Sequence, residues 1–133
     1  MTAYPLTALA TILALLVFTA FGAVVTRARG KYGVAAPATY GHPEFDRRFR
    51  VHVNTLEQLA ILLPVLWLCA VWIGDAWAGL GGLVWCVGRI VYARGYYREA
   101  RQRESGFYIT VTPVVVMTIA VIVAVAMKLV AAA

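Results

Sequence analysis

Four long apolar stretches constrain the fold of this chain more than any other feature. The first runs from Met1 to Thr26 without a charged residue, and the others lie within 52–74, 76–88 and 106–130. A helix that crosses the hydrocarbon core needs about 20 apolar residues, and the shorter stretch 76–88 is expected to continue as a helix through Arg89, Tyr92 and Tyr96. We therefore predict an all-α integral membrane protein with four transmembrane helices that form one domain over residues 1–133. Their predicted bounds are about 4–29, 44–74, 76–101 and 106–130.

The composition supports a membrane protein over a soluble one. Sixty-two per cent of the residues are hydrophobic and 14% are charged, whereas soluble domains are about 45–50% apolar and about 25% charged. This excludes a disordered chain, an ordinary soluble enzyme and a nucleic-acid-binding module. The missing basic segment before the first stretch, with Arg27 behind it, also favours a span over a secretory signal peptide.

The positive charges predict an orientation in the membrane. Of the 12 lysines and arginines, all but Lys128 lie in or beside the connections after the first and third helices. The turn near Gly74 carries only Asp75. Because positive residues favour the cytoplasmic side, we expect both long connections to be cytoplasmic and both termini to lie on the opposite side.

Polar residues form two stripes on otherwise apolar helices. One stripe has the spacing i, i+4, i+7, i+8 and consists of Arg50, Asn54, Glu57 and Gln58. The other has the spacing i, i+3, i+7 and consists of Arg89, Tyr92 and Tyr96. Each spacing places its members on one helical face. Ionisable groups at membrane depth are costly, so we expect both stripes to face neighbouring helices or a wet cavity.

Two interpretations of these stripes are open. In the structural one, Glu57 pairs with Arg50 or Arg89, the tyrosines lie in an interfacial aromatic belt, and the arginines extend to lipid phosphates. In the functional one, the arginines bind carboxylates, Glu57 binds an ammonium group, and Asn54 adds a neutral hydrogen bond. A zwitterion with two carboxylates and one ammonium, such as glutathione, satisfies this set.

The cysteines and histidines do not predict a metal site. Cys69 and Cys86 fall inside apolar stretches and are expected to be small buried hydrophobes. His42 and His52 have no cysteine or acidic partner at metal-ligand spacing, so we expect no metal.

Three motifs carry a resemblance to a known family. Residues 45–57 fit F-x-R-x-x-R-x-x-x-N-x-x-E, residues 41–45 fit G-x-P-E-F, and residues 89–96 fit R-x-x-Y-x-x-G-Y. This combination resembles the MAPEG family, the membrane-associated proteins in eicosanoid and glutathione metabolism. The four apolar stretches and the chain length agree with that resemblance.

The resemblance implies a homotrimer that binds glutathione between neighbouring protomers near the cytoplasmic side. It assigns glutathione contacts to Arg29, Arg50, Asn54, Glu57, Arg89, Tyr92 and Tyr96. His52 and Gln58 are additional candidate contacts, since they replace polar residues of the family pattern. Arg103 matches an arginine that lies beside the thiol in one branch of the family, and is therefore the candidate catalytic residue.

The expected function is a membrane-bound glutathione transferase that conjugates glutathione to a lipophilic electrophile from the bilayer, or reduces lipid hydroperoxides. Gly30 stands where the leukotriene-forming branch has a second arginine, which disfavours leukotriene synthesis. A non-enzymatic lipid-binding family member is the first alternative. A small proton-coupled exporter is a weaker one, because the first and fourth apolar stretches contain no acidic residue at depth.

Overall fold

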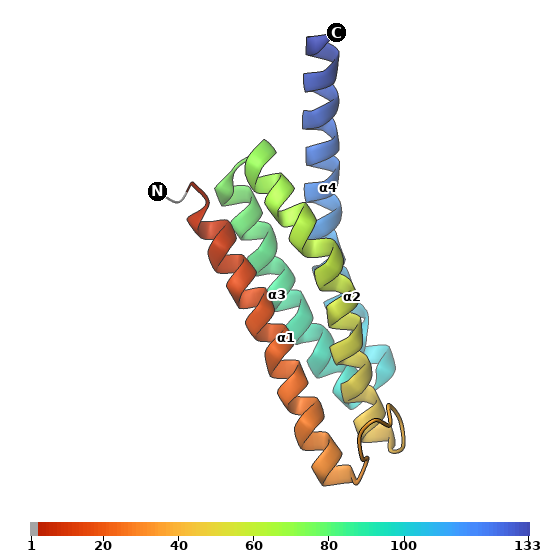
Figure 1. Ribbon diagram of the computed structural model, residues 1–133. Helices are drawn as coiled ribbons and strands as arrows, with labels where there is room; N and C mark the ends of the chain where they lie inside the picture. The colour runs from red at the N-terminus through yellow and green to blue at the C-terminus, as the bar shows by residue number, and fades with distance from the viewer. Residues whose placement is uncertain (1–2) are drawn as a thin grey trace.

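A computed structural model describes residues 3–133 as a bundle of four long helices and one short 3-10 helix (Figure 1). The helices are α1 (Pro5–Tyr32), α2 (Pro43–Trp72), α3 (Asp75–Arg98), η1 (Ala100–Arg103) and α4 (Glu104–Ala132). The four long helices are each long and apolar enough to cross a membrane, which confirms the predicted number of spans. Figure 1 places the start of α1, the α2–α3 turn and the C-terminus at one end of the bundle. We call this the closed end, and the opposite end, with the 33–42 connection and η1, the basic end.

The ends of α1 and α3 differ most from the predicted ones, and the other helix ends lie close to theirs. α1 continues past Arg29 to Tyr32, and Gly33 then ends it with a left-handed φ of 69°, a conformation that glycine adopts without strain. α3 ends at Arg98 and not near Arg101, because Glu99 is extended and the chain turns back into η1. A Cβ atom on Gly95 would collide with the backbone of Gln102. Glycine is therefore what lets this turn fold back onto α3.

Glycines bring α3 into close contact with its neighbours along its length. A Cβ atom on Gly82 would lie 2.7 Å from Cβ of Ala10 in α1 and 3.1 Å from Leu66 in α2. A Cβ atom on Gly88 would lie 2.6 Å from the backbone nitrogen of Thr110 in α4. Small residues allow helix backbones to approach closely inside membranes. α3 accordingly packs against each of the other three long helices.

A carboxylate joins the two chain segments of the closed end. Asp75, the first residue of α3, accepts hydrogen bonds from the backbone N–H groups of Leu6 (3.0 Å) and Thr7 (2.8 Å) and from the Thr7 hydroxyl (2.8 Å). The first N–H groups of a helix have no partner within the helix, and a carboxylate there also interacts favourably with the helix dipole. Asp75 therefore caps α1 from another helix, across 68 or more positions of sequence.

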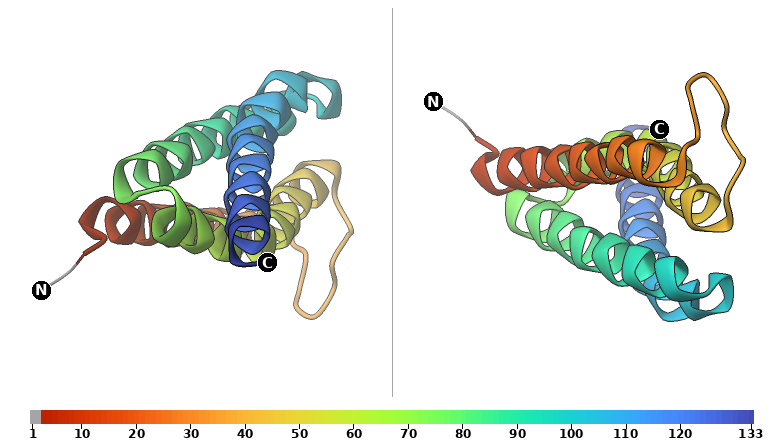
Figure 2. Two further views of the ribbon diagram at one scale, coloured as in Figure 1. Left: turned by 90° about the horizontal axis from the view of Figure 1, so that it is seen from above. Right: turned by 90° about the horizontal axis from the view of Figure 1, so that it is seen from below.

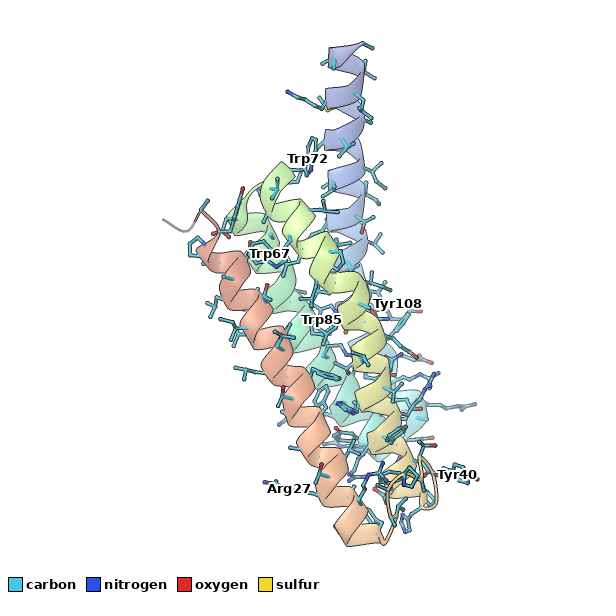
Figure 3. All side chains as sticks on the ribbon, in the orientation of Figure 1. Arg27, Tyr40, Trp67, Trp72, Trp85 and Tyr108 are labelled. Carbon is cyan, nitrogen blue, oxygen red and sulfur yellow. The ribbon has the colours of Figure 1, made fainter. Side chains whose placement is uncertain are left out.

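The interior is apolar and so is much of the outer surface. Trp85 lies fully buried at the centre of the bundle (Figure 3), and Cys69 and Cys86 are buried free thiols, as predicted. Large apolar side chains are exposed along all four long helices. Trp67 and Trp72 lie towards the closed end in Figure 3 and are partly exposed. A soluble protein would bury such side chains, whereas lipid tails can cover them.

Candidate functional site

A buried arginine connects the two predicted polar stripes. Arg89 is 0% exposed, and its Nη2 donates hydrogen bonds to Oγ1 of Thr55 (2.8 Å) and Oδ1 of Asn54 (3.1 Å). The guanidinium carbon lies 4.1 Å from the ring centroid of Tyr92. A charge at this depth needs such polar partners to offset its desolvation. The stripes on α2 and α3 therefore face each other inside one chain.

Asn54 extends this connection to an exposed carboxylate. Its Nδ2 donates to Oε2 of Glu57 over 3.1 Å, so the order of contacts is Arg89, Asn54, Glu57. In the part of the chain that the structure describes, both ion pairs within 4.0 Å belong to Glu44. The direct pairing of Glu57 with Arg50 or Arg89 that the structural interpretation requires is therefore wrong. Glu57 is exposed and has no cation at ion-pair distance among residues 3–133.

Aromatic rings continue the arrangement towards the basic end. The ring centroids of Tyr92 and Tyr96 are 5.6 Å apart, and the Arg103 guanidinium carbon lies 5.5 Å from the Tyr96 centroid. Cation–π contacts of this length orient a guanidinium without neutralising it. Arg103 is exposed, so its charge remains available at the end of the row. We define the polar row as Glu57, Asn54, Arg89, Tyr92, Tyr96 and Arg103.

A wide hollow opens beside the end of the polar row. Its volume is about 600 Å³, and both Arg50 and Tyr96 line it. Its other lining residues are Thr39, Tyr40, Asp46, Arg47, Phe49, Arg98, Glu99 and Ala100. Three arginines and two carboxylates line it, and Arg50 and Arg98 form no ion pair within residues 3–133, so either can contact an anionic ligand.

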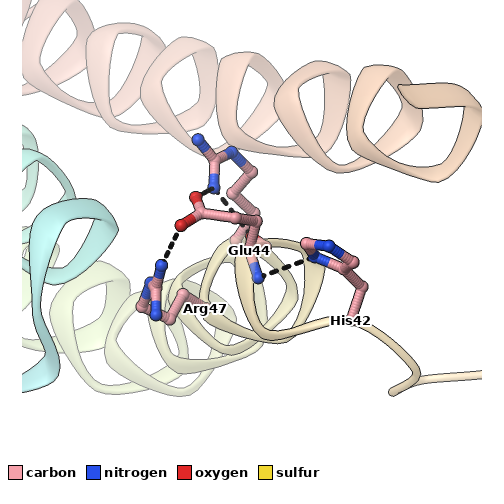
Figure 4. Close-up of polar contacts among 4 residues, drawn as sticks. His42, Glu44 and Arg47 are labelled. Atoms are coloured by element: carbon pink, nitrogen blue, oxygen red, sulfur yellow. Dashed lines mark hydrogen bonds and ion pairs between the residues drawn. The ribbon is translucent and has the colours of Figure 1, made fainter. Parts of the chain in front are cut away.

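Ion pairs fix the start of α2 next to this hollow. The carboxylate of Glu44 binds Arg47 and Arg48, the latter at 2.7 Å from Nη1 to Oε2. Figure 4 shows Glu44 with Arg47 on one side and His42 on the other, where His42 Nδ1 accepts from the Glu44 N–H at 3.2 Å. His42 thereby caps α2, and Pro43 follows at the first helical position.

Arg29 lies apart from the polar row. Its Nη1 donates to the carbonyl groups of Ala38 (2.7 Å) and Val34 (3.4 Å), and its guanidinium carbon lies 4.8 Å from the Phe45 ring centroid. Within one chain it holds the 33–42 connection against α2. A guanidinium has five N–H donors, so those on Nε and Nη2 are not used by these bonds.

His52 and Gln58 also lie outside the polar row, on two further faces of α2. The His52 ring stacks on Phe18 of α1 with centroids 4.5 Å apart. Gln58 lines an apolar groove of about 380 Å³ between α2 and α4, together with Ile61, Phe107 and Val114. The groove suits an apolar chain, and Gln58 adds a polar group to its wall.

The sequence stripes missed Thr55. Its hydroxyl accepts from Arg89 and donates to the Val51 carbonyl over 2.7 Å, and the residue is fully buried. Thr55 was overlooked because a threonine in an apolar helix ordinarily bonds only to its own backbone. Its position next to Asn54, on the side of α2 that faces α3, was the available signal.

The motifs on α2 and α3 contain most residues of the polar row. A comparison with known protein families shows which family shares them. The model of the MAPEG family matches residues 7–123. The chain belongs to the MAPEG family. This confirms the resemblance drawn from the sequence, and with four span-capable helices it makes the chain an integral membrane protein.

Relatives of this MAPEG protein include proteins that are named as enzymes. It is 51% identical over 102 residues to an uncharacterized protein of Synechocystis sp., covering 77% of this chain and 72% of that protein. It is 37% identical to leukotriene C4 synthase from Bos taurus, covering 74% of this chain and 65% of that enzyme. It is 35% identical to microsomal glutathione S-transferase 2 from Homo sapiens, covering 74% of this chain and 67% of that protein.

Proposed function

We propose that this MAPEG protein is a membrane-bound glutathione transferase. The observation that carries the proposal is Glu57, an exposed carboxylate without a cationic partner among the described residues, held by Asn54 and through it by buried Arg89. Its charge suits the ammonium group of glutathione. Arg50, at the adjacent hollow, suits a glutathione carboxylate. The glutathione-using names of its relatives support the same substrate.

The proposed chemistry begins with ionisation of the glutathione thiol. A free thiol has a pKa of about 8.5, and the thiolate is the nucleophile. The positive charge of Arg103, at the end of the polar row, favours the thiolate, and the thiol proton leaves to solvent. The sulfur then forms a bond to an electrophilic carbon of the lipophilic substrate, while the bond from that carbon to its leaving group breaks. In the alternative outcome, two glutathione molecules reduce a lipid hydroperoxide and become a disulfide.

The positions of Arg29 and His52 support a site shared between protomers of a homotrimer. Both residues lie on the α1 side of α2, whereas Asn54 and Glu57 join the polar row towards α3. One chain therefore does not bring all the predicted glutathione contacts together. A neighbouring copy that presents its α1–α2 side to the polar row would complete the set.

The apolar groove between α2 and α4 is the proposed entry for the second substrate. Except for Gln58 and Thr118, its lining residues are apolar, and it opens towards lipid. Glutathione would arrive from the basic end, which we propose to be cytoplasmic because the arginines of both long connections gather there. The groove also favours the second candidate function, a lipid-binding family member without glutathione chemistry.

The proposal is tested by titrating bound glutathione on detergent-purified protein. Thiolate absorbance would be followed against pH for the wild type, Arg103→Ala and Arg98→Ala. We expect wild type to bind glutathione with a thiol pKa below about 8.5. We expect Arg103→Ala to return that pKa towards its free value and to lower the rate at pH 7 by about 10–100-fold, with affinity at high pH within a few-fold of wild type.

This experiment distinguishes the two candidate functions, and it distinguishes Arg103 from Arg98 as the residue that activates the thiol. A wild type that does not bind glutathione would overturn the transferase in favour of the lipid-binding function. If Arg103→Ala titrates like wild type, Arg103 is not the activating residue. A shift for Arg98→Ala would then assign that role to Arg98, which lines the wide hollow.

A further inference from the structure

A second, smaller hollow lies at the basic end, away from the polar row. It is formed by the last turns of α1 and the start of α2 and has a volume of about 240 Å³. Its lining residues are Val24, Arg27, Ala28, Lys31, Tyr32 and Arg48. Three of the six are cations and none is acidic. It shares no lining residue with the wide hollow beside Arg50.

Two of these cations have no anionic partner. Arg27 and Lys31 are exposed, and neither forms an ion pair with any of residues 3–133. Arg48 is held from behind, because its Nη1 binds both the carboxylate (2.7 Å) and the backbone carbonyl (2.7 Å) of Glu44. Tyr32 lies between them, with its ring centroid 5.3 Å from Lys31 Nζ and 5.8 Å from the guanidinium carbon of Arg48. The hollow therefore has one fixed cation and two that are free to close on an anion.

The depth of the hollow matches that of lipid phosphates. Residues 5–26 of α1 contain no charge, so Arg27 is the first charged side chain that α1 reaches on leaving the hydrocarbon core. Figure 3 shows Arg27 near the basic end of α1, and Figure 2 shows α1 and α3 diverging towards that end. This is the level at which phosphate groups of a bilayer lie.

The helical face that carries Arg27 and Lys31 continues as an apolar stripe. Leu9, Leu16 and Ala20 follow at the spacing of that face, and all three are exposed, with Leu16 at 57%. A soluble anion would use the cations alone. A lipid would use the cations for its phosphate and the stripe for an acyl chain, so the combination favours a lipid.

We infer that the hollow formed by Arg27, Lys31 and Arg48 is a binding site for the phosphate of an anionic membrane lipid. Charge-assisted bonds from Arg27 and Lys31 would bind the phosphate oxygens, and Arg48 would complete the cradle. This inference is independent of glutathione chemistry.

The test compares lipid retention in two variants that lose the same charge. The full chain would be placed in phosphatidylcholine nanodiscs with a phosphatidylglycerol fraction, and bound phosphatidylglycerol would be counted by native mass spectrometry. We expect Arg27→Gln with Lys31→Gln to weaken phosphatidylglycerol binding about tenfold, since two cations contact the phosphate. The matched control, Arg94→Gln with Arg101→Gln, removes two exposed arginines outside the hollow and should stay within about twofold of wild type.

Three results would overturn the inference. Equal losses in both double variants would show that only net charge attracts the lipid. Unchanged binding in the Arg27 and Lys31 variant would show that the hollow does not bind it. Displacement of phosphatidylglycerol by inorganic phosphate at equal concentration would assign the site to a free anion. The charge-retaining variant Arg27→Lys with Lys31→Arg should keep the lipid preference, and it separates a binding defect from a folding defect.

Discussion

The two ends of the bundle are built in opposite ways. At the closed end, Asp75 caps α1 with three hydrogen bonds, and Gly82 lets α3 contact both α1 and α2. At the basic end α1 and α3 diverge (Figure 2), and hollows of about 600 and 240 Å³ open among arginines. The first end has satisfied polar groups, and its own hollow of about 260 Å³ is apolar. The hollows of the second end are lined by positive charge, which favours anionic ligands.

This contrast separates stability from ligand binding. The closed end has little polar surface to offer a ligand, since the hollow near Trp77 and Cys69 is almost entirely apolar. The basic end keeps cations such as Arg27 exposed and without ion pairs among residues 3–133, which contributes little to stability. Substitutions at the closed end should therefore lower stability and leave glutathione binding unchanged. Substitutions at the basic end should weaken binding and leave stability unchanged.

The largest effect is expected from Glu57→Gln. The change keeps the shape but removes the carboxylate proposed to bind the glutathione ammonium. We expect glutathione binding to weaken by about 2–4 kcal/mol, because the pair of Glu57 with the ammonium would be buried in the proposed site between protomers. The unfolding temperature should barely change, because Glu57 is exposed and accepts a single hydrogen bond, from Asn54. Calorimetric titration and thermal unfolding in one detergent measure both. Unchanged binding with a large loss of stability would instead support a purely structural role.

Gly82→Val should have the next largest effect, and on stability. Its Cβ would lie 2.7 Å from Ala10 Cβ, so α1 and α3 must separate. Overpacking of this kind costs about 1–3 kcal/mol. Gly30→Ala is the matched control, because no atom lies within 4 Å of its Cβ position. As a residue inside α1, it should stabilise the protein by up to about 1 kcal/mol. If Gly82→Val and Gly30→Ala lowered stability equally, close packing at Gly82 would not explain the loss.

Asp75→Ala should destabilise the closed end by about 1–2 kcal/mol, the usual cost of losing a helix cap. The N–H groups of Leu6 and Thr7 lose their acceptor. Glutathione affinity should stay within about twofold of wild type, since the cap lies at the other end of the bundle. Asp75→Asn keeps one acceptor oxygen and should recover most of the stability. A loss of glutathione binding in Asp75→Ala would break the separation of the two ends.

The smallest effect is expected from Thr55→Val, which tests whether a polar-row contact contributes to both stability and binding. The variant is nearly isosteric but leaves Arg89 Nη2 with Asn54 as its remaining bonded partner. We expect a loss of about 1 kcal/mol in stability and a smaller decrease in glutathione affinity through Asn54. Thr55→Ser retains the hydroxyl and should restore both. If Thr55→Ser loses as much stability and affinity as Thr55→Val, the hydroxyl does not position Arg89.

The sequence by itself determined the membrane character, the number of spans and the two polar stripes. Three apolar stretches that are long enough to cross a bilayer core leave few other folds, and helical periodicity predicts which residues share a face. The contact between Asn54 and Arg89 confirms that the stripes on α2 and α3 meet, whereas Gln58, predicted to share the face of Asn54, lines the groove towards α4. The resemblance to the MAPEG family was confirmed by the match over residues 7–123.

Only the tertiary structure decided which partner each polar group has. Periodicity gives a face but not the helix opposite it, so the sequence left the partner of Glu57 open, and within the chain that partner is Asn54. The cap that Asp75 provides joins residues 68 or more positions apart, a distance at which no local pattern is informative. Arg29 and His52 were grouped with the stripe residues, yet they pack against the 33–42 connection and Phe18. Their placement depends on how α1 crosses α2, which is set by the packing of whole helices.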